Sequence, residues 1–267
     1  MTARTAMPEA SAPGSAPGGA VTGGWSGPDP ALLPLLYLAG QTLPVGGFAW
    51  SQGLEAAVEQ GLAGDAAGLR RWLAGVLHYG LARNDLPLLL RLHRAAMTQD
   101  ATGLRFWNDR VLASRESAEL WQEEVQMGRA LRRLLTDTGL LAAAGPLPGM
   151  DLPDDAGYTA CFAAAAALLQ TRAAKAAPTP GQAASFGLNA ACAYAWSWLQ
   201  NQTAMACKTV PLGQTAAQKL LLEFLSLLPQ EAAQAAALDD TAVGASLPGL
   251  ALCSAAHERQ YSRLFRS

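Results

Sequence analysis

Residues that could do chemistry are few and scattered in this 267-residue sequence. It contains three histidines, His78, His93 and His257, and four cysteines with no Cys-x-x-Cys pair. Cys253 and His257 stand four residues apart, a spacing that on a helix places both on one face, as two ligands of one metal require. Two ligands do not complete a metal site, and chance easily produces this spacing. We therefore expect no metal ligand in the chain, and expect His78 and His93 to be ordinary helix residues.

The sequence motifs of nucleotide binding and of nucleophilic catalysis are missing. The sequence has no Gly-x-x-x-x-Gly-Lys-Ser/Thr loop, no Gly-x-Gly-x-x-Gly and no Gly-x-Ser-x-Gly. Asp239 and Asp240 could contribute to an ion site, but without further ligands they are typical of a loop. The sequence therefore predicts no catalytic residue and no cofactor, so the protein is not expected to be an enzyme.

Charge and cysteine usage limit the classes of partner and the cellular compartment that we expect for the protein. The net charge of −2 and the isoelectric point of about 5.9 provide no overall basic field for nucleic acid or anionic lipid. The longest uncharged stretch, 176–207, carries amide side chains and is broken by Pro178, Pro180 and Gly181. We expect it to form a buried helix after a loop and not a membrane span. The widely separated cysteines and the lack of a signal-peptide core predict reduced thiols in the cytoplasm.

Composition decides the fold class. The chain has 56 Ala and 43 Leu but only 8 Val and no Ile. Ala and Leu lose little entropy in a helix, whereas a sheet favours β-branched and aromatic side chains. Apolar residues recur at helical spacing through much of the chain, as in Leu69, Trp72, Leu73, Val76 and Leu77. The sequence therefore predicts an all-α, single-domain bundle of roughly ten helices.

The chain divides into a leader, a helical domain and a tail. Residues 1–30 contain 5 Pro, 6 Gly and 6 Ala, so we expect a disordered leader. Residues 31–240 form the predicted helical domain, with a long loop or linker at 139–157. Residues 241–267 form a tail with little to hold it on the body. Helices are expected over 30–39, 48–60, 158–175 and 182–208, from Asp65, from Asn84 or Asp85, and from Ser117, with a further one through Leu228.

Charged residues at helical spacing have an ordinary explanation. Arg105 with Asp109, and Arg115 with Glu119, stand four apart. Such pairs are typical of a solvated helix face and contribute a few tenths of a kcal/mol each. We expect these four side chains to lie on the surface.

Two internal segments are unusual without being catalytic. The segment Leu43–Glu55 combines a rigid Gly-Pro turn, at Pro44, Gly46 and Gly47, with the aromatic residues Phe48 and Trp50 and one acidic residue. Its glycines and proline indicate a backbone held for a purpose, although a loop that only packs aromatics into the core would look similar. Trp196 and Trp198 point in roughly opposite directions on a helix, so at most one faces a single core layer. The other faces a second helix layer or a partner.

The C-terminal tail is the third unusual feature. Free tails are usually polar, but this one interleaves arginines with apolar and aromatic residues, the types that carry interface hot spots. We expect a docking peptide and not a frayed end. Its candidate partner-binding residues are Arg259, Tyr261, Arg263, Leu264, Phe265 and Arg266.

Several fragments, taken in order, resemble the urease accessory protein UreF family from about Leu32 to Ser267. They are Leu43-Pro44-Val45-Gly46-Gly47-Phe48, Ser51-Gln52-Gly53-Leu54-Glu55, Asp85-Leu86-Pro87, Glu119-Leu120, Met127-Gly128, Ala195-Trp196-Ser197-Trp198, Lys208-Thr209-Val210-Pro211-Leu212-Gly213-Gln214-Thr215, Gln218, and Arg263-Leu264-Phe265-Arg266-Ser267. Each fragment alone is weak, but their joint presence in this order makes the resemblance strong.

The resemblance implies an all-helical, cytoplasmic protein without catalytic activity. Such proteins act with UreD (UreH in some organisms) and the GTPase UreG on apo-urease, and enable GTP-dependent insertion of nickel. The resemblance further implies a tail that becomes ordered on UreD/UreH, and a homodimer. The alternative is a regulator of UreG GTP hydrolysis, for which the sequence nominates no arginine. A helical scaffold from an unrelated assembly is a third reading.

The resemblance also suggests which residues face the partner. Glu55 and Lys208 match acidic and basic positions that the family places near this surface, although a solvated helix end and a surface lysine would look the same. Asp85 matches the family too, but is expected to cap a helix. Trp121 stands where the family usually has Arg, and Trp50 where Tyr is common, so contacts of those residues are lost.

Overall fold

The computed structural model describes residues 29, 31–141, 152–174 and 178–266, and within these the chain is helical throughout, with no strand. The expected all-α class is confirmed. The α-helices are α1 (Leu32–Leu38), α2 (Leu54–Glu59), α3 (Ala66–Gly75), α4 (Asp85–Met97), α5 (Ala101–Ala113), α6 (Ala118–Asp137), α7 (Tyr158–Ala174), α8 (Pro180–Thr209), α9 (Gln214–Leu225), α10 (Leu228–Ala236) and α11 (Pro248–His257). Three shorter turns are η1 (Gly47–Ala49), the π-helical η2 (Val76–Leu81) and η3 (Asp240–Ala242).

The alanine-rich helix α7 forms the centre of the core. Every residue from Tyr158 to Leu168 is buried, including five consecutive alanines. Such small side chains let neighbouring helices approach closely, and α7 packs chiefly against α4 and α6, with α1, α5 and α8 also in contact. The excess of Ala in the composition thus serves close helix packing.

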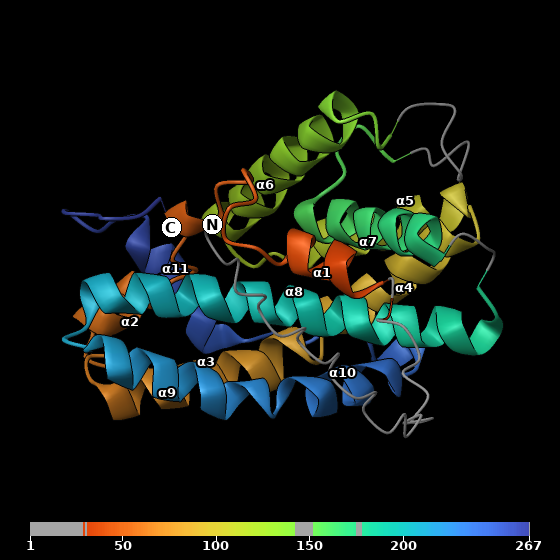
Figure 1. Cartoon of the computed structure of the whole chain (residues 1–267). Coiled ribbons are helices and arrows are strands. Elements are labelled where there is room, and N and C mark those ends of the chain that lie inside the picture. The colour runs from red at the N-terminus through yellow and green to blue at the C-terminus, as the bar shows by residue number, and fades with distance from the viewer. Residues whose placement is uncertain (1–28, 30, 142–151, 175–177, 267) are drawn as a thin grey trace, which may run out of the picture.

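The 30-residue helix α8 organises the rest of the molecule. Figure 1 shows α8 crossing the whole width of the molecule, with α9 and α10 along one side and α7 along the other. At one end of α8 lie α2 and α11, which pack against each other although they are almost 200 residues apart in the chain. Segments from both ends of the sequence therefore meet there.

Several helix starts follow from side-chain caps predicted by the sequence. The Asp65 carboxylate accepts a hydrogen bond from the Gly68 backbone N–H at 2.7 Å, and the Ser117 hydroxyl accepts one from Leu120 N–H at 3.1 Å. These side chains satisfy backbone donors that a helix terminus leaves unpaired. The expected long helix near 182–208 begins slightly earlier, at Pro180.

The expected helix over 48–60 is wrong in its first half. Only the short turn η1 is helical before Trp50, and α2 begins at Leu54. The interruption comes from Gln52 and Gly53, whose φ angles are +52° and +74°. Two successive left-handed residues cannot continue a right-handed helix.

The expectations for the chain beyond Gln214 also need correction. The helix expected to run through Leu228 is two helices, because α9 ends at Leu225 and α10 begins at Leu228. The tail was expected to have little that holds it on the body, but it contains α11, and His257 at the end of α11 is completely buried. Segment 241–266 therefore packs onto the helical body.

Some expectations fall on residues that the structure does not describe. The leader 1–30 lies outside the described residues except for Asp29, and so do residues 142–151 of the expected loop at 139–157. The described helices include none that is long and apolar enough to cross a membrane.

Candidate functional site

The carboxylate of Glu55 is an attachment point for the C-terminal tail. Glu55 lies in the first turn of α2 and is 6% exposed. It accepts hydrogen bonds from the backbone N–H groups of Leu264 at 2.8 Å and Phe265 at 3.1 Å. A buried carboxylate needs such donors, and a peptide backbone supplies them whatever its side chains. Glu55 is therefore not a solvated helix end, because the tail covers it.

His257 connects the Glu55 carboxylate to a second buried carboxylate. Its Nε2 lies 3.1 Å from a Glu55 oxygen, and its Nδ1 lies 2.9 Å from an oxygen of Glu119 on α6. Both ring nitrogens donate only when the imidazole is protonated. The Arg263 guanidinium also lies 3.2 Å from Glu119. Burial raises the pKa of Glu119, and its hydrogen bond to His257 opposes this rise.

Apolar and cation–π contacts complete the attachment of the tail. Phe265 is buried, and the Lys208 Nζ atom lies 5.6 Å from the centre of its ring. The backbone N–H of Arg266 donates to the Ala49 carbonyl at 2.7 Å, and its guanidinium lies 5.9 Å from the Trp50 ring centre. Glu55 and Lys208 thus both meet the tail, from α2 and α8.

The outer side of this attachment is exposed and apolar. Phe48 is 67% exposed, Leu264 is 69% exposed and Tyr261 is fully exposed. Three basic residues of this region are also exposed: Lys208, Arg259 and Arg263. An open pocket of about 640 Å³ lies beside the tail, between Trp50, α6 and the last arginines. The surface combines exposed apolar and aromatic side chains with arginines, a composition typical of docking sites.

The loop before η1 is shaped by its glycines. Gly46 has a φ of +78°, which a residue with a side chain rarely adopts. A Cβ atom on Gly47 would lie 2.9 Å from Asn201 Nδ2 and 3.2 Å from Met127 Cε, so the backbone lies directly against α8 and α6. Gly46 and Gly47 therefore hold the loop close to the body, while Pro44 and Phe48 remain exposed.

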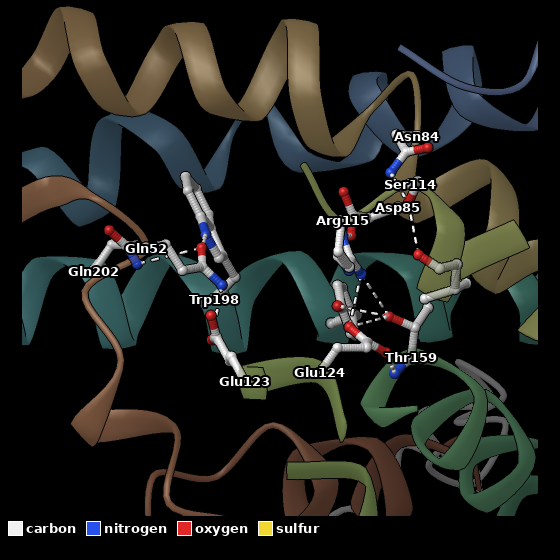
Figure 2. A network of polar contacts seen from close by, with 12 residues as sticks. Gln52, Asn84, Asp85, Ser114, Arg115, Glu123, Glu124, Thr159, Trp198 and Gln202 are labelled. Atoms are coloured by element: carbon white, nitrogen blue, oxygen red, sulfur yellow. Dashed lines mark hydrogen bonds and ion pairs between the residues drawn. The ribbon is translucent and has the colours of Figure 1, made fainter. Parts of the chain in front are cut away.

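Beneath the loop, Gln52 connects α6 to α8. Its Nε2 donates to Glu123 Oε1 at 2.9 Å, and its Oε1 accepts from the Trp198 indole N–H at 2.7 Å. Gln202 Nε2 lies 3.5 Å from the same oxygen. Figure 2 shows these four side chains converging. Trp198 therefore faces the core, whereas Trp196 lines a separate apolar groove with α1, so the two tryptophans point in different directions as predicted.

A second polar group surrounds Arg115. Its guanidinium lies 2.7 Å from Asp85 and 2.7 Å from Glu124, and Thr159 N–H also donates to Glu124 at 2.7 Å (Figure 2). Burial alone would lower the pKa of Arg115, but the two carboxylates hold it well above its usual value. Asp85 was expected to cap α4 with its side chain, but its carboxylate pairs with Arg115 instead.

A cavity of about 90 Å³ lies between the two polar groups. This volume accommodates several water molecules. Asn84 Oδ1 and Arg115 Nε are buried without a hydrogen-bond partner among the described residues, and both residues line the cavity. Burial raises the pKa of Glu123, which also lines it, to about 8, although its hydrogen bond from Gln52 opposes the shift. Glu123 is therefore largely protonated at neutral pH.

The geometry overturns the solvated-face expectation for Arg115 and Glu119. Glu119 is buried and Arg115 is partly buried, and neither pairs with the other, because Arg115 binds Asp85 and Glu124 whereas Glu119 binds His257 and Arg263. Arg105 and Asp109 are exposed as expected. His93 is buried and hydrogen-bonded to Gln170, and burial lowers its pKa.

The described residues contain no group of three or more His, Cys, Asp or Glu side chains suited to a metal ion. Cys253 and His257 share a buried face of α11, but both nitrogens of His257 already face carboxylates.

Sequence reasoning missed the roles of Gln52, Glu119, Glu123 and His257. Gln52 and Glu119 belonged to fragments that carried the resemblance, but no local pattern marked them as bridging residues. Their partners lie 71 residues or more away along the chain. Such contacts depend on tertiary packing.

A sequence model of the UreF family matches residues 63–225, more than half of the chain. The chain belongs to the UreF family. It is 46% identical over 237 residues to the urease accessory protein UreF of Chromohalobacter salexigens, covering 89% of this chain and 95% of that protein. It is 46% identical over 239 residues to the UreF of Psychrobacter cryohalolentis, covering 90% and 95%. For the UreF of Marinobacter nauticus the identity is 44% over 242 residues, covering 90% and 96%.

Most of the fragments that resemble UreF meet at one end of the molecule. The glycine loop, Glu55, Glu119, Met127, Lys208 and the terminal segment all contribute to the tail attachment or to the loop beneath it. In this UreF chain, fragments scattered over more than 200 residues form one surface. That surface is the candidate functional site.

Proposed function

We propose that this protein acts in urease maturation as a non-catalytic accessory protein of the cytoplasm. It forms a complex with UreD/UreH and the GTPase UreG on apo-urease, and enables GTP-dependent insertion of nickel into the urease active site. Membership of the UreF family supports the urease role, because the relatives are named urease accessory proteins. Nickel is the cargo of this complex, and we assign it no ligand in this chain.

The attachment of the tail to Glu55 is the observation that supports a docking role. From Leu264 and Phe265, Glu55 accepts hydrogen bonds of the backbone N–H groups and not of the side chains. The side chain of Leu264 is thereby left exposed to solvent, as are the side chains of Phe48 and Tyr261. Exposed apolar side chains on a firmly held backbone form a preorganised docking surface, because little entropy is lost when a partner covers them.

We therefore propose UreD/UreH as the partner of this surface. Phe48, Tyr261 and Leu264 supply its apolar centre. Arg259, Arg263, Arg266 and Lys208 supply its charge. Glu55 and Phe265 act from beneath, by holding the tail in place, and so contribute to docking without facing the partner.

Truncation and point variants test this proposal together. Deletion of 259–267 should abolish co-purification with UreD/UreH and leave the helical circular dichroism intact. Leu264→Asp and Tyr261→Ala should weaken the complex at least tenfold without lowering the melting temperature, because both side chains are exposed. Leu252→Asp is the matched control, since Leu252 is equally exposed but lies on α11 outside this surface. Retained binding after the truncation would overturn the docking role of the tail.

The second candidate function is regulation of UreG. Exposed arginines in the tail could act on a GTPase in trans, where an arginine stabilises transition-state charge. UreG turnover measured with and without this protein separates the candidates. A pure scaffold leaves the rate unchanged, whereas a regulator changes it, and loss of that change in Arg259→Ala would locate it in the tail.

We propose that the chain also forms a homodimer, through a contact surface on another side of the molecule. An apolar groove of about 290 Å³ runs between α1, α8 and α10, lined by Leu32, Leu36 and Trp196 among others. Leu32 and Leu36 are about half exposed. Sedimentation of Leu36→Asp should then show monomers, while Leu62→Asp, similarly exposed on another face, should leave the dimer intact.

A further inference from the structure

Gln52 adopts a backbone conformation that residues with side chains rarely take. Its φ of +52° lies in the left-handed region, and Gly53 follows at +74°. Glycine tolerates this region, but a residue with a Cβ atom is strained in it and persists only where its surroundings hold it. The sequence therefore keeps a glutamine where the backbone alone would favour glycine.

The side chain of Gln52 provides a reason. The Trp198 indole can only donate, so the amide atom facing it at 2.7 Å is the oxygen, and the amide nitrogen consequently faces Glu123. One short side chain thus binds α8 through its oxygen and α6 through its nitrogen. Figure 2 shows Gln52 between Trp198 and Glu123, beside Gln202.

The same chain segment carries the docking surface. Trp50 lines both the cavity between the polar groups and the open pocket beside the tail. The Ala49 carbonyl binds the tail at Arg266 N–H, and Phe48 projects outward. Any shift of Gln52 relative to α6 and α8 would therefore displace three neighbours along the chain together. They are Trp50, the Ala49 carbonyl that binds the tail, and the exposed Phe48.

We propose that Gln52 is a positioning residue for partner docking. Its amide fixes segment 46–53 against α6 and α8 in the conformation that binds the tail and presents Phe48. This inference rests on the proposed docking function. Glu123 is largely neutral at neutral pH because burial raises its pKa, so its contact with Gln52 needs an acceptor and no charge.

The test uses a substitution that relieves strain while removing the amide. In Gln52→Gly, glycine accepts the left-handed backbone, so the fold should be kept and the melting temperature should stay close to the wild-type value. Gln99→Gly is the matched control, because Gln99 is also left-handed, with a φ of +56°, but is exposed between α4 and α5. Glu123→Gln retains an acceptor for Gln52 and is the conservative variant.

Two measurements decide the outcome. The first is the affinity of the full chain for UreD/UreH. We expect Gln52→Gly to weaken it at least tenfold, and Gln99→Gly and Glu123→Gln to leave it within twofold. A merely structural role would instead lower stability and affinity in parallel. Equal affinities for Gln52→Gly and Gln99→Gly would overturn the proposal.

The second measurement needs no partner and is hydrogen exchange of the isolated protein. Gln52→Gly should speed exchange over 46–53 and at Leu264 to Arg266, whereas Gln99→Gly should not. Unchanged exchange there overturns the positioning role even if docking itself is confirmed. Faster exchange combined with no UreD/UreH binding by the wild type would leave the positioning role standing and overturn the docking function on which its purpose rests.

Discussion

The guanidinium of Arg115 lies 2.7 Å from the carboxylate of Asp85, and this contact joins the start of α4 to the connection that precedes α6. Arg115 also binds Glu124 within α6 at 2.7 Å. A single cation therefore neutralises two carboxylates that are removed from water. The ion pairs hold the N-terminal half of α6 beside the N-terminus of α4, and so help to shape the cavity between them.

Removing this cation should destabilise the fold strongly. In Arg115→Met, Asp85 and Glu124 remain buried without a counterion, and breaking a buried pair in this way costs about 3–5 kcal/mol. Urea unfolding measures the change. Arg133→Met is the control, because Arg133 and Asp137 are exposed and 3.9 Å apart, and an exposed pair contributes at most about 1 kcal/mol. Similar losses in the two variants would contradict the role of Arg115.

Glu123 should make stability depend on pH in a defined direction. Its pKa rises from an ordinary 4.5 to about 8 on folding, so between these values the folded state binds a proton that the unfolded state does not. Its stabilisation is thus fully present below about pH 4.5 and is lost as pH rises through about 8. Relative to Glu123→Gln, the wild type should lose stability over this window, by up to about 1.4 kcal/mol per pH unit. Parallel curves for the two proteins, from denaturant unfolding at each pH, would refute this.

Two helical glycines should respond oppositely to alanine. A Cβ atom on Gly128 of α6 would meet the Ala156 carbonyl and lie 2.8 Å from Tyr158 N, so Gly128→Ala should destabilise by about 1–3 kcal/mol, as overpacking does. A Cβ atom on Gly75 would meet nothing within 4 Å, so Gly75→Ala should stabilise by about 0.5–1 kcal/mol. Thermal unfolding of both variants checks the signs. A stabilising Gly128→Ala would show that the loop before α7 does not pack on α6 as described.

Loss of the imidazole should release the tail. In His257→Ala, Glu55 and Glu119 face each other in a buried site without the ring between them. We expect trypsin to cleave the variant at Arg259 and Arg263 at least tenfold faster than the wild type, followed by mass spectrometry. His78→Ala is the control, since His78 is partly exposed and its ring nitrogen faces Glu231, far from the tail in the sequence. Equal cleavage of the two variants would show that the tail is held by other contacts.

Residue types and periodicity were sufficient to predict most of the fold. The helical class follows from Ala and Leu, and Asp65 and Ser117 mark helix starts because capping is a local effect. The helix α11 was missed, since its short apolar run ALCSAA has no cap and follows a proline-containing segment. The break at Gln52 was missed because nothing local requires a glutamine to be left-handed.

The candidate site was predicted only in part. The glycine loop, Glu55, Lys208 and the tail were singled out, and the structure brings them together. The sequence did not show that the tail binds Glu55, nor that Glu119 and His257 complete this attachment site. Periodicity assigned Arg115 and Glu119 to a solvated face, because spacing along one helix does not reveal partners on others. Whether Glu55, Lys208 and the tail residues bind a partner stays a prediction.

The alanine helix α7 has a consequence for how the molecule comes apart. A helix with buried residues all round has no side that can rest against water, so it needs neighbours on every face at once. Separation of α8, or of α4 and α6, from the bundle would expose the apolar surface of α7 to water. We therefore expect the bundle to unfold in a single cooperative step, and fragments ending between α7 and α8 to aggregate and not to fold as smaller bundles.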